Sequence, residues 1–279
     1  MLMAAIVVVT LYPFWYTVIG SFNQGLDFAR GGVHLWPRAF TLENYRIVFR
    51  DNTIMRAYGV TIVRTALGAT SRLLVCGLFA YAFSRPRLSF RGFYATVGII
   101  SMYFHGGIIP SYINIRDLGL LNNFFVYIFP TMFNFFHVLI ITAYMRGISH
   151  SVVESAKIDG ASDYRVFFQI ILPLSMPVFA AVGLFAAVEH WNAFFDAMMY
   201  VSRRELYTLQ VLLMEIIRTQ QAAAIMAAEM MADLPEDATS TGTTVQLATM
   251  VAAIGPVIAL YPFLQKYFVT GIMIGSVIG

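Results

Sequence analysis

Residues 149–173 read SHSVVESAKIDGASDYRVFFQIILP and lie between two strongly apolar stretches of the chain. Ser151 and Glu154 have the spacing of a capping box, which predicts that a helix begins at Ser151. Gly160 permits the left-handed backbone that ends such a helix. Ser162 can then cap a second helix that leads into the next apolar stretch. This segment therefore predicts a helix–turn–helix elbow between two long apolar helices.

The composition indicates that these apolar stretches lie in a membrane. Of 279 residues, 59% are hydrophobic and 12% are charged. Soluble domains are about half apolar and about a quarter charged, so these charges are too few to cover a water-facing surface. The formal net charge of +3 is too small and too dispersed to indicate nucleic-acid binding. The single cysteine, Cys76, cannot form an internal disulfide, and we expect it to fill the core.

The apolar segments predict an all-α, polytopic membrane protein with about six transmembrane helices. Each segment is close to the length of about 20 residues that crosses the hydrocarbon layer. Helices satisfy their own backbone groups in lipid. We expect one transmembrane domain, residues 1–279, with the elbow (residues 149–173) between the fourth and fifth spans. The predicted spans are Leu2–Phe22, Thr61–Phe83, Phe93–Tyr112, Phe124–Tyr144, Leu172–Trp191 and Val245–Phe268.

Positive charges in short loops predict the orientation. The connection Ser84–Gly92 carries three arginines, and Arg146–Ile171 carries two arginines and a lysine. Both connections, and Lys266, fall on one side of the predicted bundle, which is read as cytoplasmic. The longer connections, residues 23–60 and 202–244, then lie on the opposite, extracytoplasmic side of the membrane.

The two outer connections differ in composition. The stretch Leu42–Phe49 is amphipathic, and residues 202–244 begin in a helical pattern. Their polar end, Asp233–Thr244, is predicted to be a mobile loop. Pro173 and Pro177, at the start of the fifth span, are predicted to kink it.

The elbow resembles the "EAA" loop of ABC importer permeases. In that pattern Glu-Ala-Ala is followed by a glycine and then by Ile-x-Leu-Pro, all at fixed offsets. Ser155 replaces the second residue of the pattern, a change from one small side chain to another. The positions that match are Glu154, Ala156, Gly160, Ile170, Leu172 and Pro173.

Other segments resemble the carbohydrate-importer permeases of the maltose-permease type, and most closely the branch for complex oligosaccharides. The chain departs from this branch at Ile278, where a lysine is usual. The similar segments are Gly106–Pro110, Ile115–Leu120, Trp191-Asn192, Tyr261–Phe268 and Met273–Ser276.

The resemblance implies a multi-pass subunit of the bacterial cytoplasmic (inner) membrane with four kinds of partner: lipid, a second homologous permease, two ATP-binding-cassette ATPases and a solute-binding protein. The chain has no phosphate-binding loop of the Gly-x4-Gly-Lys-Ser/Thr type. We therefore expect no cofactor and no catalytic or metal-binding residue in this chain, with Mg-ATP on the partner ATPases. The residues implied to couple to the ATPase are Glu154, Ser155, Ala156, Asp159, Gly160 and Ala161.

Polar residues near the end of the fifth span are candidates for a substrate path, because polar groups in a membrane span are costly. Glu189, Asn192 and Asp196 are spaced three and four residues apart and share a helix face. Trp191 could stack on a sugar ring. Alternatively, this helix end simply meets water and the interfacial aromatic belt.

Arg64 and Arg72 lie within the second predicted span. Arg64 is predicted to snorkel to the outer surface, and Arg72 to pair or to face water. They could attract an acidic sugar, or they could form structural ion pairs between helices or subunits. Tyr103, His105 and Asn134 are further candidates within the membrane.

The predicted function is the permease subunit of an ATP-driven importer that moves oligosaccharides, including acidic, uronate-containing ones, into the cytoplasm by alternating access. A permease of the same superfamily for a non-sugar solute remains an alternative, as does a stand-alone secondary transporter. An embedded enzyme is disfavoured, because the sequence shows no nucleophile–base pair and no metal constellation.

Overall fold

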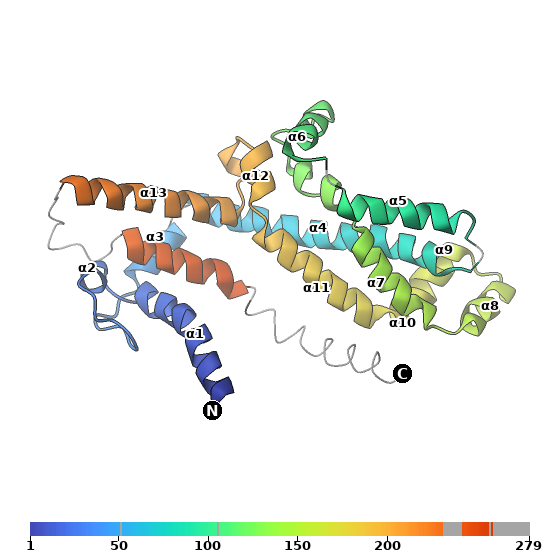
Figure 1. Cartoon of the computed structure of the whole chain (residues 1–279), viewed down its shortest axis with the longest axis horizontal. Helices are drawn as coiled ribbons and strands as arrows, with labels where there is room; N and C mark the ends of the chain where they lie inside the picture. Colours follow the sequence, from blue (N-terminus) through green and yellow to red (C-terminus); the bar gives the residue numbers. More distant parts are fainter. Residues whose placement is uncertain (51, 87, 105, 231–241, 257, 259–279) are drawn as a thin grey trace. The chain divides into compact units, whose positions relative to one another are not determined.

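A computed structural model describes residues 1–50, 52–86, 88–104, 106–230, 242–256 and 258 (Figure 1). These residues form helices joined by turns, with one isolated antiparallel bridge between Asn23 and Phe40. This confirms the predicted all-α fold class. The named α-helices are α1 (Leu2–Ser21), α2 (Gly25–Ala29), α3 (Glu43–Arg50), α4 (Asn52–Ser84), α5 (Arg91–Tyr103), α6 (Ile108–Asp117), α7 (Phe135–Arg146), α8 (His150–Ile158), α9 (Asp163–Val166), α10 (Leu172–Leu174), α11 (Met176–Asn192), α12 (Phe195–Tyr200) and α13 (Leu209–Met230).

The chain divides into two compact units, one of Met1–Val60 with Arg203–Ala259 and one of Thr61–Ser202 with Leu260–Gly279. The single transmembrane domain expected for residues 1–279 stays a prediction. Within the described residues, α1 and α4 are each long and apolar enough to cross a membrane, and three bent helix pairs would make three more spans. Of the sixth predicted span, residues 245–256 and 258 are helical, and the other residues lie outside the described part of the chain.

The third predicted span is divided between α5 and α6 rather than forming one straight helix. Gly107 precedes α6 with a φ of +84°, a backbone conformation that side chains other than glycine rarely adopt. Pro110 falls in the first turn of α6, where a missing backbone N–H costs no helical hydrogen bond. The Gly-Gly-Ile-Ile-Pro segment thus starts a new helix.

The fourth predicted span is also bent, by 51°, where two 3-10 turns meet α7. These turns are η1 (Phe124–Tyr127) and η2 (Phe129–Thr131). Asn134 caps α7, because its side-chain oxygen accepts a hydrogen bond of 3.2 Å from the backbone N–H of His137. Asn134, a candidate for the substrate path, therefore has a structural task at this bend.

The fifth predicted span bends by 83° between α10 and α11, at Ser175. The chain enters this bend through a π-helical turn, η3 (Phe167–Ile171), which makes i→i+5 hydrogen bonds. Pro173 and Pro177 lie on either side of Ser175. Since proline cannot donate a backbone hydrogen bond within a helix, the predicted kink is confirmed.

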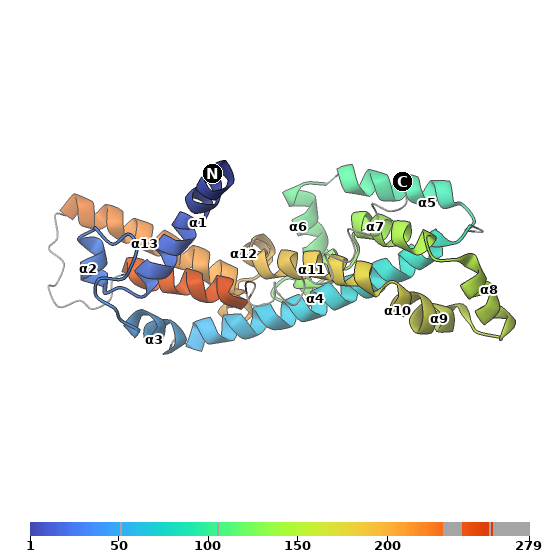
Figure 2. The same ribbon diagram turned by 90° about the horizontal axis from the view of Figure 1, so that it is seen from below.

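The second unit has its core where α4, α7, α9 and α11 meet, and Figure 2 shows the elbow helices next to the C-terminal end of α4. Cys76 is fully buried in this core, as expected. Phe167 from η3 and Val182 from α11 are buried in the same cluster. The core therefore joins the elbow to the long helices.

The first unit is tied together by side-chain amides. Asn44, on the predicted amphipathic stretch that forms α3, donates to the backbone oxygens of Ser21 (3.0 Å) and Asn23 (2.9 Å). Asn23 in turn donates a 2.9 Å bond to Asp27. This bond, together with Arg38, holds the pKa of Asp27 below its ordinary value. The predicted mobile loop Asp233–Thr244 lies mostly outside the described residues.

One glycine on α5 provides a test of this packing. A Cβ atom at Gly98 would lie 2.3–2.4 Å from ring atoms of Phe135, which is buried on α7. We expect Gly98→Ala to lower the free energy of unfolding by about 1–3 kcal/mol, the usual cost of overpacking. Thermal unfolding of the purified protein measures this. Gly92→Ala on the same helix is the control, because no atom lies within 4 Å of its Cβ position. Equal midpoints for the two variants would contradict this packing.

Candidate functional site

The elbow consists of α8 and α9 with a tight turn between them. Ser149, not Ser151, stands at the N-cap of α8, and no side chain there bonds to the helix backbone. The two serine hydroxyls bond to each other instead, 2.7 Å apart. The predicted capping box is therefore wrong: Ser151 lies inside the helix. Ser162 does cap α9, where its hydroxyl accepts a 3.3 Å bond from the backbone of Arg165.

Gly160 makes the turn. Its φ is +77°, and the backbone N–H of Gly160 bonds to the oxygen of Lys157 at 3.0 Å. The N–H of Ala161 bonds to the oxygen of Ala156 at 2.9 Å. This pair of bonds is the Schellman arrangement, which ends a helix on a left-handed residue. The turn predicted at Gly160 is confirmed.

The residues implied to couple to an ATPase separate into an outer and an inner set. Ala156 is buried and belongs to the core, together with Val153, and Ala161 is half-buried. The others are exposed, and so is Ile158, whose exposed fraction is 85%. The exposed members are Glu154, Ser155, Asp159 and Gly160.

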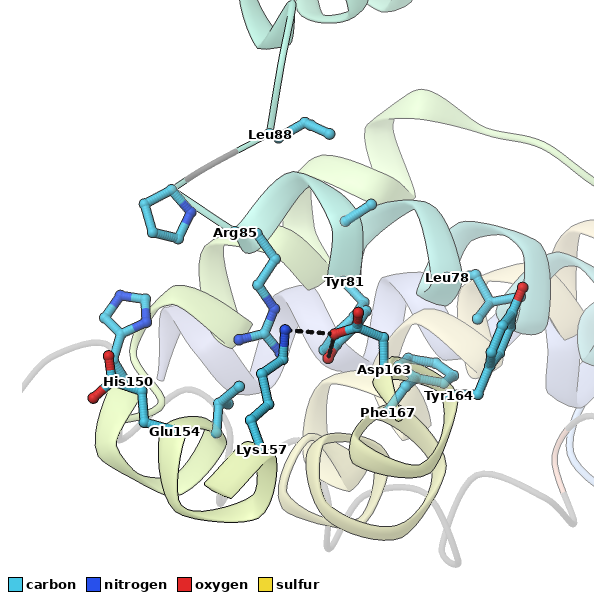
Figure 3. Close-up of a pocket in the computed structure, with 13 residues that line it drawn as sticks. Leu78, Tyr81, Arg85, Leu88, His150, Glu154, Lys157, Asp163, Tyr164 and Phe167 are labelled. Atoms are coloured by element: carbon cyan, nitrogen blue, oxygen red, sulfur yellow. Dashed lines mark hydrogen bonds and ion pairs between the residues drawn. The ribbon is translucent and has the colours of Figure 1, made fainter. Parts of the chain in front are cut away.

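A cleft of about 610 Å³ separates the elbow from the C-terminal end of α4. Lys157 on α8 and Asp163 on α9 form an ion pair of 3.0 Å in it (Figure 3). The hydrogen bond from Lys157 lowers the pKa of the Asp163 carboxyl. Tyr81 on α4 donates to the same carboxylate at 3.4 Å. A short polar chain thus connects α4 to both helices of the elbow.

Arg64 on α4 is the first of two buried arginines that hold α4 to the segment of α11 and α12. Its guanidinium forms an ion pair with Asp196, with one hydrogen bond of 3.1 Å, and also donates to the backbone oxygen of Ala193 at 3.2 Å. It lies 4.5 Å above the ring of Tyr127. Because the exposed fraction of Arg64 is 1%, the prediction that it snorkels to the surface is wrong.

Arg72 lies two turns further along α4 and binds Glu189 on α11. Both carboxylate oxygens of Glu189 accept from the guanidinium, one of them at 3.2 Å, and the Arg72 Nε donates to the backbone oxygen of Thr131 at 2.7 Å. Arg72 is buried, whereas 55% of the Glu189 side chain is exposed. Of the alternatives that the sequence left open, this geometry corresponds to ion pairs between helices.

His190 occupies the space between the two ion pairs. Its ring lies against α4 at Gly68, where a Cβ atom would be only 2.4–2.7 Å from ring atoms. His190 is buried, and neither ring nitrogen has a hydrogen-bond partner within the part of the chain that the structure describes. The contact at Gly68 lets α4 and α11 approach closely enough for the arginines to reach their carboxylates.

The remaining candidates for a substrate path are scattered. Trp191 is buried, so its ring is not free to stack on a sugar. Asn192 is exposed on α11, and Tyr103 is 79% exposed at the end of α5. His105 lies outside the described residues. Sequence reasoning missed His190, and no spacing in the sequence relates it to Gly68.

The Arg72–Glu189 pair makes a quantitative prediction. Glu189→Leu leaves a buried arginine without its anion, which we expect to lower the free energy of unfolding by about 3 kcal/mol. Replacing Arg72 by Leu as well should recover most of that loss, because no lone charge remains. Thermal unfolding of the single and double variants measures the difference. Asp117→Leu is the control, since its pair with Arg116 is exposed and should change stability by less than about 0.5 kcal/mol. A double variant as unstable as Glu189→Leu would contradict the pairing.

Comparison with known proteins identifies the family. The family "Binding-protein-dependent transport system inner membrane component" matches residues 66–274. The chain is 36% identical to protein LplC of Bacillus subtilis over 97% of this chain and 90% of that protein. It is 34% identical to the polygalacturonan/rhamnogalacturonan transport system permease protein YtcP of Bacillus subtilis, over 97% and 93%.

A solved structure has the same fold over nearly the whole chain. It is the crystal structure of a bacterial ABC transporter involved in the import of the acidic polysaccharide alginate, with a TM-score of 0.86 and 32% sequence identity. The match covers 96% of this chain and 94% of the chain in that structure. The elbow, the apolar helices and these matches lead to one conclusion: this chain belongs to the family of inner membrane components of binding-protein-dependent transport systems, as a multi-pass permease subunit of an ABC importer.

Proposed function

We propose that this permease moves acidic oligosaccharides into the cytoplasm. The observation that carries the proposal is the match, at 32% identity over 96% of the chain, to a transporter involved in alginate import. Similarity to a polygalacturonan/rhamnogalacturonan permease points to the same substrate class, because both substrates carry uronate groups. A second permease, two ATPases that bind Mg-ATP and a solute-binding protein complete the proposed importer.

The elbow is the proposed contact with an ATPase. Its outward residues include the carboxylate of Glu154, which can pair with a basic group of the partner, and the apolar side chain of Ile158. A short amphipathic helix of this kind suits a groove in another protein. Gly160 sets the angle at which α9 leaves this contact.

We infer that motion of the elbow reaches α4 and α11 together. The Lys157–Asp163 pair and Tyr81 join the elbow to α4, and η3 joins it to α11 through the chain. The pairs of Arg64 and Arg72 then hold α4 to the segment of α11 and α12. ATP binding can bias an equilibrium between states only through contacts that differ between them, and the outer face of the elbow is the surface where such contacts can form.

One face of α11 is the proposed sugar path. Phe185, Glu189 and Asn192 are exposed and spaced three and four residues apart. A carboxylate and an amide are too costly to face lipid, and they suit the hydroxyls of a sugar in a water-filled path. Arg64 and Arg72 are buried in ion pairs, so their proposed role is to hold this face in place rather than to bind a uronate directly.

The substrate is tested by the ATPase activity of the purified importer in lipid, with its binding protein and a panel of neutral and uronate oligosaccharides. We expect uronate oligosaccharides to stimulate hydrolysis, and neutral oligosaccharides of equal length to serve as the control. Stimulation by neutral sugars alone would overturn the acidic substrate. Stimulation by a non-sugar solute alone would overturn the sugar assignment.

Coupling is tested at Gly160. A valine there must adopt a left-handed backbone, which costs about 1–2 kcal/mol, and no atom of this chain lies within 4 Å of its Cβ position. We expect Gly160→Val to lower transport per ATP hydrolysed by about tenfold, since the turn rather than the packing is disturbed. Gly160→Asn is the control, because asparagine tolerates this backbone. Normal coupling in Gly160→Val would mean that the turn does not transmit motion.

A further inference from the structure

The cleft beside the elbow has a size and a set of lining side chains that the proposed contact with an ATPase does not explain. Its volume of about 610 Å³ lies within the range of about 300–1,000 Å³ typical of small-molecule sites. Leu78 and Ala82 on α4 and Phe167 at the base of the elbow give the cleft an apolar lining, and Figure 3 shows Leu78 and Phe167 among its lining side chains. The space is therefore large enough for a ligand with a substantial apolar part.

Arg85, at the end of α4, supplies a cation to this cleft. Its guanidinium lies 4.1 Å from the centre of the Tyr81 ring. The Arg85 Nε is buried without a hydrogen-bond partner, and the described residues hold no carboxylate in an ion pair with Arg85. Lys157 and Asp163 form an ion pair in the same cleft, and the carboxylate of Glu154 also lines it. Arg85 is thus the lining cation that has no carboxylate in direct contact among the described residues, although, besides the hydrogen bond from Lys157, its charge helps to lower the pKa of Asp163.

The segment that follows Arg85, up to the first turn of α5, has the composition of a membrane–water interface. Arg87 and Arg91 follow it within six residues, and Phe90 and Phe93 are 79% and 65% exposed. Basic and aromatic residues gather at the level of lipid headgroups, and basic segments on the cytoplasmic side attract anionic lipids. In the orientation predicted from the loop charges, this segment and the cleft lie on the cytoplasmic side, where the anionic lipids are.

We propose that the cleft binds one anionic phospholipid of the cytoplasmic leaflet. Its phosphodiester accepts hydrogen bonds from Arg85, and the first part of an acyl chain lies along Leu78 and Ala82. The bound lipid fills the space between α4 and the elbow, so that a push on the elbow moves α4 instead of closing the cleft. Transport then depends on anionic lipid, whichever sugar is carried.

The test uses the complete importer in nanodiscs of phosphatidylcholine with increasing phosphatidylglycerol. Native mass spectrometry counts the phosphatidylglycerol molecules that stay bound to the importer. Titration of the ATPase activity gives the phosphatidylglycerol content at which this activity is stimulated half-maximally. We expect Arg85→Gln to retain less phosphatidylglycerol and to raise the half-maximal amount about fivefold, which corresponds to about 1 kcal/mol for one basic residue at an anionic surface. Arg85→Lys keeps the charge and should stay near wild type.

Two further variants separate this site from general charge effects. Arg116→Gln removes a charge from an exposed pair outside the cleft and should change nothing. Ala82→Phe keeps every charge but fills the cleft, and should lose the retained lipid. Wild-type retention in both Arg85→Gln and Ala82→Phe would overturn the proposal, as would equal retention of phosphatidylcholine. If Ala82→Phe instead releases the ATPases and keeps the lipid, the cleft belongs to the ATPase contact and the proposal is wrong.

Discussion

Two buried arginines on α4 constrain the architecture of the second unit. Charged groups in the interior of a membrane protein are costly unless each has a partner. Arg64 and Arg72 lie two turns apart, and their carboxylates, Asp196 and Glu189, are spaced seven residues apart on the opposing segment. Both pairs can form together only when α4 and α11 run antiparallel in one register. The ion pairs thus select this register from the many that apolar packing alone would allow.

The close approach of the two helices follows from this register. Gly68 lies between the arginines, and the His190 ring fills the space that a larger residue would occupy. Since α11 continues through the bend at Ser175 into the elbow, the chain links the charged pairs to the proposed ATPase contact. Glu189 belongs to one ion pair and also to the exposed face of α11, so the contact that fixes the register also orients the proposed sugar path.

The sequence predicts the fold and the elbow well because both depend on local patterns. Apolar length predicts the helices, and the turn at Gly160 follows from a residue that tolerates positive φ. The breaks within the third and fourth spans were missed, since Gly107 and Asn134 act through local backbone geometry that length and hydropathy do not register. The start of α8 at His150 was also missed, because two serines lie close together and only the backbone geometry decides which one stands at the N-cap position.

The pairing of the charged residues could also not be predicted, and the reason is a different one. The sequence places the charged residues Arg64, Arg72, Glu189 and Asp196 in or near membrane spans, but the residues that meet lie 117 and 132 positions apart. Only the packing of α4 on α11 brings them together. For the same reason, Trp191 and Asn192 are neighbours in the sequence, yet one is buried and the other exposed.

The central claim is that the elbow, α4 and α11 move as one body during transport. The most direct measurement is the distance between spin labels at Leu67→Cys on α4 and Tyr164→Cys on α9, both exposed positions, in a Cys76→Ala background. Double electron–electron resonance of the complete importer gives this distance without nucleotide and with ATP bound. The account predicts the same distance in both states. A shift of about one helical turn, roughly 5 Å, would show that the elbow moves against α4, and would contradict the claim.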